Sequence, residues 1–562
     1  MPWQRPTVPI AALLLCTLLA GACEQQAPAS LVVTGARVWT GDAARPWAEA
    51  LASRDERIVA VGSAAEIEQL IGDGTEVIRA DGGLLVPGFI DSHVHFLTGG
   101  AGLASVQLRE ARSADEFRQR IAAFAAELNP GEWILNGNWD HENWGGELPR
   151  RDWIDAVTPH NPVWINRLDG HMALANSRAL ELAGVDADTP DVDGGDIVRD
   201  RDGRPSGVLK DNAMALVDAA VPPYSEAQLD RHAQAAMAYV AANGVTSVHD
   251  MADFRSLAAY RRARAAARLA TRIYSVVPLP EWRALADDIA AHGRGDEWLR
   301  VGGVKGFMDG SLGSHTAAFL QPFSDAPGDR GLLVSDRDDM RRWIGAADDA
   351  GLQVMVHAIG DRAIRDLLDI YLDVADDHGA RDRRFRIEHA QHIAPQDLPR
   401  FAAQQVIASM QPYHAIDDGR WADKVIGAER ALTTYAFRSL IASGAHVAFG
   451  SDWFVAPPTP IDGIYAAVTR RTLDGAHPDG WVPSQKISVE QALAAYTSEA
   501  AYASFEEDVK GRLKAGMLAD FVLLDRDLTR IPPQTIRDTR ILRTVVGGRT
   551  VYRADAGRAG TP

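Results

Sequence analysis

The strongest constraint on the fold is an alternation of short β-branched apolar runs with alanine-rich stretches, which extends from about residue 84 to residue 450. Such alternation is typical of βα units built around a parallel sheet. Eight runs can be assigned as strands, and a closed barrel of parallel strands requires eight. The sequence therefore predicts an α/β fold with one (β/α)8 TIM barrel, whose strands cover residues 84–91, 245–249, 272–277, 301–308, 353–357, 385–388, 406–410 and 446–450.

The segments outside these runs predict two further parts. Residues 99–244 are too many for one βα loop, so we expect an insert over the mouth of the barrel. Near both chain ends, short apolar runs broken by Gly and Asp indicate antiparallel strands. We expect residues 31–85 and 505–555 to form one discontinuous β-sandwich domain beside a barrel domain of residues 86–504.

The first 23 residues have the pattern of an export signal. Arg5 precedes an apolar run from Val8 to Ala20, which is too short to span a bilayer comfortably. Residues 18–23 resemble the processing site of bacterial lipoproteins, which implies that Cys23 carries lipid. Glu24 then resembles the pattern for the outer membrane, so we expect an exported lipoprotein that faces the periplasm. Simple cleavage of the signal is the alternative.

The net charge of the chain argues against one class of binding partner. With 58 Lys and Arg against 76 Asp and Glu, the formal net charge is −18, which argues against non-specific binding of nucleic acid. We expect a small-molecule substrate and a membrane contact through the lipid anchor. A homodimer is left open.

Six side chains that can bind metal occur in order along the predicted strands. His93 and His95 follow the first strand as His-Val-His, and the period of two in an extended chain places both on one side. The C-terminal ends of barrel strands are where barrel enzymes keep their active sites. The sequence therefore predicts a metal centre at the barrel mouth, with His93 and His95 as its first ligands.

These motifs resemble a known superfamily. Residues 87–95, Pro-Gly-Phe-Ile-Asp-Ser-His-Val-His, resemble the first strand of the amidohydrolases. Residues 168–177, 308–314 and 409–415 resemble the amidohydrolase family 3 branch, which includes N-substituted formamide deformylases and exoenzyme regulators. The resemblance extends from about Val33 to Val551, with His315 where the branch commonly has Arg. It implies a metal centre formed by His93, His95, Lys305, His357, His389 and Asp452, in which CO2 carbamylates Lys305. The alternative for Lys305 is an ion pair with a nearby carboxylate such as Asp309.

The ligand types and the resemblance together predict a reaction. Histidines with a carboxylate suit zinc, and we expect one or two ions. We expect metal-activated water to hydrolyse a C–N bond in an amide or N-substituted formamide, with Asp452 as general base and then general acid. The Trp-rich insert favours an apolar or aromatic substituent on the nitrogen.

Other residues are assigned to the substrate pocket. We expect His171 to act in catalysis by reaching the substrate or its oxyanion, with a loop-anchoring role as the alternative. His414, Asp309 and Trp139 are expected to contact the substrate, although large aromatic residues more often pack inserts together. His249 is expected to form a structural hydrogen bond.

Two other functions remain open at this stage. The barrel could serve as a non-catalytic or regulatory module of an envelope lipoprotein, because fold alone does not determine function. The same metal centre could also hydrolyse a lactone or a cyclic imide. The complete set of ligands favours an enzyme, since a binding module has no need of five metal ligands and a proton acceptor.

Overall fold

The computed structural model describes residue 3 and residues 27–555, so the predicted lipidation site at Cys23 lies outside the described residues. The centre of the molecule is an eight-stranded sheet in which all strands are parallel and neighbours follow chain order. The strands are β8 (Phe89–Val94), β14 (Val245–Met251), β15 (Arg272–Pro278), β16 (Leu299–Phe307), β17 (Gln353–Ala358), β18 (Arg386–His389), β19 (Ile407–Met410) and β20 (Val447–Phe449).

The sheet is nearly closed by contacts between β8 and the residues that follow β20. The backbone N–H of Asp452 donates to the carbonyl of His93 at 2.7 Å, and Val94 and Trp453 form a parallel bridge. These contacts confirm the predicted (β/α)8 barrel. They also bring two of the predicted metal ligands into the seam of the barrel.

Helices connect successive strands and cover the barrel. In α11, residues Ile364, Leu367, Leu368 and Tyr371 recur at helical spacing and are buried against β17, so one apolar face explains both the helix and its docking. Among residues 27–555, no helix is long and apolar enough to cross a bilayer. The connecting helices are α7 (Glu226–Ala242), α8 (Phe254–Ala265), α9 (Trp282–His292), α10 (Arg337–Asp349), α11 (Asp361–His378), α12 (Leu398–Ala403) and α16 (Phe437–Ser443).

The first predicted strand, residues 84–91, is divided in the structure. Its first half is β7 (Leu84–Pro87), which belongs to another sheet, and only β8 enters the barrel. Gly88 separates the two strands, and its N–H donates to the carbonyl of Asp520 at 2.9 Å. A Cβ atom at Gly88 would lie 2.2 Å from Oγ1 of Thr246, so only glycine fits at this crossing.

Segments from both chain ends form the predicted β-sandwich. A four-stranded sheet has the order β5-β4-β1-β6, and a six-stranded sheet has the order β23-β22-β21-β7-β2-β3. Apolar residues of both sheets share one core. The strands are β1 (Leu31–Thr34), β2 (Arg37–Trp39), β3 (Trp47–Ala48), β4 (Ala50–Arg54), β5 (Arg57–Gly62), β6 (Glu76–Arg79), β21 (Phe521–Leu524), β22 (Ile541–Val546) and β23 (Arg549–Arg553).

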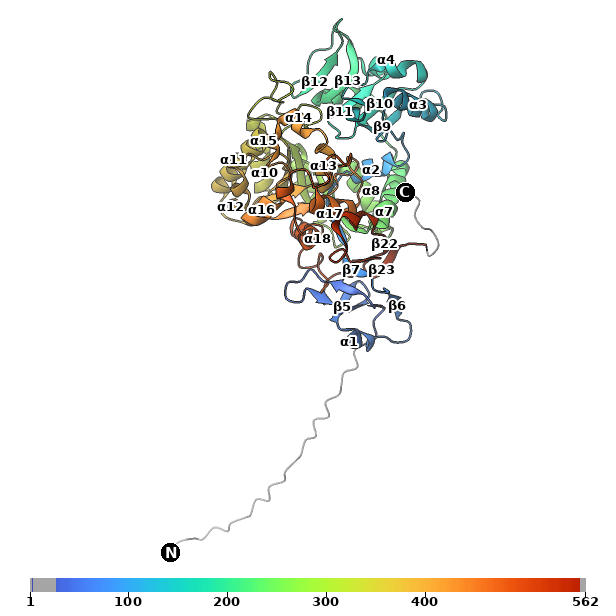
Figure 1. Ribbon diagram of the computed structural model, residues 1–562, viewed down its shortest axis with the longest axis vertical. Helices are drawn as coiled ribbons and strands as arrows, with labels where there is room; N and C mark the ends of the chain where they lie inside the picture. Colours follow the sequence, from blue (N-terminus) through green and yellow to red (C-terminus); the bar gives the residue numbers. More distant parts are fainter. Residues whose placement is uncertain (1–2, 4–26, 556–562) are drawn as a thin grey trace.

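The long connection between β8 and β14 contains a third sheet. Figure 1 shows it at the end of the molecule opposite the β-sandwich, with the barrel between them. Helix α3 (Ala114–Ala125) packs Phe117 and Ile121 onto this sheet. The strand order is β12-β13-β11-β10-β9, and the strands are β9 (Ile134–Trp139), β10 (Val163–Arg167), β11 (Met172–Ala175), β12 (Gly195–Arg199) and β13 (Pro205–Asp211).

Candidate metal centre

Three predicted ligands meet where the barrel closes. His93 and His95 lie at the end of β8, and Asp452 lies just beyond β20. Nε2 of His93 and Nε2 of His95 are each 3.5 Å from Oδ1 of Asp452. One ligand atom from each of the three residues lies within 4.8 Å of the others, a spacing that a single metal ion can bridge.

The other three predicted ligands surround the same point. The rings of His357 and His389 are 4.5 Å apart between centroids, and His389 is 4.8 Å from His93. Lys305 projects from β16 with its Nζ atom 4.3 Å from the centroid of the Phe307 ring. The structure therefore brings the six residues together at one end of the barrel.

Hydrogen bonds fix which ring nitrogen is free in His93, His357 and His389. Nδ1 of His93 is 2.5 Å from Oε2 of Glu388, and Nδ1 of His389 is 2.9 Å from Oε1 of Gln411. Nε2 of His357 is 2.9 Å from the carbonyl oxygen of Gly310. Acceptors in these positions hold the N–H and leave the second ring nitrogen with its lone pair, as in histidines that bind metals.

The electrostatic environment also fits a cation. Burial lowers the pKa of His93, His357 and His389 well below the ordinary value, which favours the neutral imidazole that binds metal. Burial also lowers the pKa of Lys305 and raises that of Asp452. On the predicted ligands, three buried polar atoms have no hydrogen-bond partner in the described chain: Nε2 of His93, Nζ of Lys305 and Oδ1 of Asp452. Such atoms are rare, and a metal ion would satisfy the ligands among them.

A buried charged pair supports His93 from within the barrel. Glu388 accepts hydrogen bonds from Arg386 at 2.7 and 3.0 Å, and Arg386 also contacts Nδ1 of His249 at 3.0 Å. His249 thus forms the expected structural hydrogen bond. Sequence reasoning missed Glu388 and Arg386, although two charged residues at a spacing of two in a buried strand were a usable signal.

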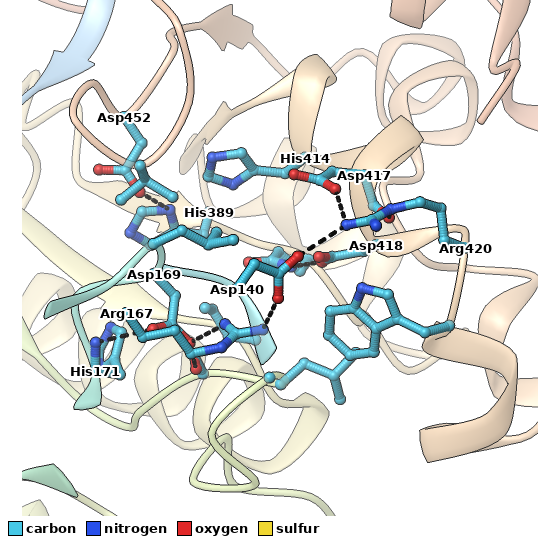
Figure 2. Close-up of a pocket in the computed structure, with 18 of the residues that line it drawn as sticks. Asp140, Arg167, Asp169, His171, His389, His414, Asp417, Asp418, Arg420 and Asp452 are labelled. Atoms are coloured by element: carbon cyan, nitrogen blue, oxygen red, sulfur yellow. Dashed lines mark hydrogen bonds and ion pairs between the residues drawn. The ribbon is translucent and has the colours of Figure 1, made fainter. Parts of the chain in front are cut away.

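Two predicted pocket residues lie beside the metal centre. His171 lies between β10 and β11 of the insert, 4.7 Å from the His357 ring between centroids, and its Nδ1 is 2.7 Å from Oδ1 of Asp211. His414 lies on α13 (Pro412–Asp418), and its Nε2 is buried without a partner in the described chain. Both line the pocket in Figure 2, whereas Asp211, which orients His171, was missed by sequence analysis.

Two pocket assignments are wrong. Trp139 is fully buried in the core of the insert, where its indole N–H donates to the carbonyl of Ile165 at 2.8 Å. Asp309 is fully buried, accepts backbone N–H groups of Ala318, Ile359 and Gly360, and does not line the pocket. Lys305 forms no ion pair with Asp309; the carboxylates whose charges raise its pKa are Glu388 and Asp452.

The pocket is more charged than the sequence suggested. The insert contributes Asp140, Arg167 and Asp169, and the region after β19 contributes Asp417, Asp418 and Arg420. Arg420 contacts Asp140 at 3.1 Å although 280 residues separate them in the chain. Asp169 lies in the segment 168–177 that resembles the family, but no local motif joins the insert residues to those after β19, so sequence analysis had no signal for their pairing.

Comparisons with known proteins identify the family of the chain. Residues 76–552 match the model of the amidohydrolase family. The chain is 42% identical to Protein LONG AFTER FAR-RED 3 of Arabidopsis thaliana over 544 residues, which are 93% of this chain and 92% of that protein. It is 29% identical to the N-substituted formamide deformylase of Arthrobacter pascens, over 92% of this chain and 97% of that enzyme.

A solved structure gives the same architecture. The crystal structure of an uncharacterized metal-dependent hydrolase from Pyrococcus horikoshii OT3 superposes with a TM-score of 0.73 at 27% identity, covering 90% of this chain and 99% of the other. The family match spans the barrel and, in the β-sandwich, the strands β6, β7, β21 and β22 and most of β23, while β1 to β5 precede it. The protein is therefore a metal-dependent hydrolase and belongs to the amidohydrolase family.

Proposed function

We propose that the protein hydrolyses the C–N bond of an amide or N-substituted formamide at a centre of one or two zinc ions. The observation that carries this proposal is the set of neutral, oriented histidines around the unpartnered Oδ1 of Asp452. His93, His95, His357, His389, Asp452 and carbamylated Lys305 would hold the metal. Bound zinc would polarise the carbonyl group and activate water. The named activity of the deformylase relative supports the choice of bond.

The environment of Lys305 supports its carbamylation. The Lys305 amine reacts with CO2 only in its neutral form, and burial lowers its pKa and so increases that form. The new N–C bond forms with loss of one proton, and the product is an anion. The carbamate would replace an amine whose nitrogen has no described hydrogen-bond partner. The negative charge of the carbamate would also interact favourably with the bound zinc ions.

The proposed proton transfers use residues that line the pocket. Asp452 accepts a proton from the attacking water and delivers it to the leaving nitrogen, so that an amine and a carboxylic acid are released. Asp211 engages Nδ1 of His171, so Nε2 of His171 is the nitrogen that can contact the carbonyl oxygen of the substrate. This contact would stabilise the negative charge that develops there.

The proposal is tested with purified protein and a panel of matched substrates. Metal content is measured first, and turnover is then followed with N-benzylformamide, N-benzylacetamide, a lactone and a cyclic imide. We expect zinc in the protein, turnover of at least one amide, and loss of turnover with a chelator that added zinc reverses. If the lactone or the cyclic imide is hydrolysed and the amides are not, the protein is a lactone or imide hydrolase instead. Full activity in metal-free protein would contradict the proposal.

A further inference from the structure

Away from the metal centre, four aspartates line the pocket, and three of them pair with arginines. Arg167 contacts Asp169 at 2.7 Å and Asp140 at 3.2 Å. Arg420 contacts Asp140 and Asp417, and Arg109 contacts Asp417 at 3.0 Å. Three arginines thus pair with three aspartates. Asp418, the fourth aspartate in this part of the pocket, forms no ion pair with any described residue.

The hydrogen bonds of Asp418 leave one oxygen free. Its Oδ2 accepts from the Tyr435 hydroxyl at 2.6 Å and from Nε2 of Gln391 at 3.0 Å. Its Oδ1 has no hydrogen bond to the described chain, and Asp418 lines the pocket. Two fixed donors on one oxygen hold the carboxylate in place, so the other oxygen is available to a ligand.

A second polar group lies in the same pocket without a partner. The His414 side chain lines the pocket and is nine-tenths buried, and its Nε2 makes no described hydrogen bond. Figure 2 shows its ring between Asp452 on one side and the pair of Asp417 and Arg420 on the other. Burial raises the pKa of Asp418 to about 7, while Arg167 and Arg420 lower it, so a bound cation would favour the ionised carboxylate. The pocket therefore offers polar contacts that continue from the metal centre to the carboxylates.

We propose that the part of the pocket around Asp418 binds a positively charged nitrogen on the substituent of the substrate. The ligand class is an ammonium or amidinium group, because its N–H groups can donate to the free Oδ1 and its charge favours the ionised form of Asp418. A substituent with a positive charge differs from the apolar or aromatic substituent that the sequence favoured. The inference rests on the proposed function, which places the scissile bond at the metal centre and directs the substituent towards Asp418.

The experiment compares two substrates of the same shape and different charge. The cationic member is N-[para-(aminomethyl)benzyl]formamide, and the neutral member is N-(para-ethylbenzyl)formamide. The zinc-loaded protein is expected to prefer the cation by about tenfold or more in kcat/KM, which is the scale of one hydrogen bond between charged groups. Asp418→Asn should abolish this preference. The matched control Asp479→Asn, which removes an exposed carboxylate outside the pocket, should retain it.

A binding measurement separates this inference from the proposed reaction. The same two benzyl groups are attached to methanesulfonamide, which an amide hydrolase does not cleave, and binding is measured by calorimetry. Tighter binding of the cation, lost in Asp418→Asn, supports the inference even if neither formamide is hydrolysed; that result would contradict only the reaction. Equal binding, stronger binding of the neutral compound, no binding of the cation, or a preference retained in Asp418→Asn would overturn the inference.

Discussion

Nδ1 of His93 and Oε2 of Glu388 lie 2.5 Å apart inside the barrel, and neither side chain is accessible to solvent. Partners of this kind orient metal-binding histidines, and their loss typically lowers metal affinity by roughly 10- to 100-fold. We expect Glu388→Gln to weaken zinc binding by that factor, because an amide holds the ring less strongly than a carboxylate. Competition with a chromophoric chelator measures the affinity.

A matched pair provides the control for Glu388. Glu499 accepts from Nδ1 of His446 at 2.7 Å, but both side chains are partly exposed and lie outside the metal centre. Glu499→Gln should leave zinc affinity unchanged. Unchanged affinity in Glu388→Gln as well would show that Glu388 does not orient His93.

Lys305→Ala should remove metal and activity while the barrel stays folded. The loss of rate should be several decades, because about 1.4 kcal/mol of lost stabilisation costs a factor of ten. Acetate or formate should partly restore turnover, since a small carboxylate can occupy the space left by the carbamate. Zinc content and turnover are measured with and without the added anion. An unmodified ammonium predicts full metal occupancy in the variant and no rescue.

Asp418→Asn should change the pH dependence of stability. Burial raises the pKa of Asp418 from 3.8 to about 7; Asp417 also raises it, while Tyr435, Arg167 and Arg420 lower it. In the unfolded chain the group loses its proton near pH 3.8, whereas in the folded protein it keeps the proton up to about pH 7. The folded wild type therefore loses stability as the pH rises between these two values. The variant should therefore gain stability relative to the wild type between about pH 4 and 7. Urea unfolding at several pH values measures this gain, and Asp479→Asn should show none.

We propose that lipid on Cys23 anchors the exported protein to a membrane, and Cys23→Ser tests this. Acyl chains would be the strong anchor, since the helices between residues 27 and 555 include none that could span a bilayer. The variant should appear in the soluble fraction after cell disruption, whereas the wild type should sediment with membranes. Sedimentation of the variant after a high-salt wash would contradict lipid anchoring.

The barrel and its ligands could be predicted because their signals are local. Buried parallel strands are continuous apolar runs, and the ligands follow the ends of those runs. The assignment of Trp139 failed because composition does not show whether an aromatic side chain faces a pocket or a core. Asp211 and Asp418 were missed because their roles depend on His171 and Tyr435, which are distant in the chain and near only after folding.

The pairing of β7 with β21 has a consequence for folding. Leu85 lies opposite Leu523 in this antiparallel pair, so the sheet needs residues from both ends of the chain. During synthesis, β7 leaves the ribosome long before its partner exists, and one edge of its sheet remains unpaired until the last segment arrives. Contacts this far apart in sequence form slowly, and an unpaired apolar edge attracts other chains. A shortened chain that ends before residue 521 should therefore aggregate, even though it keeps every strand of the barrel.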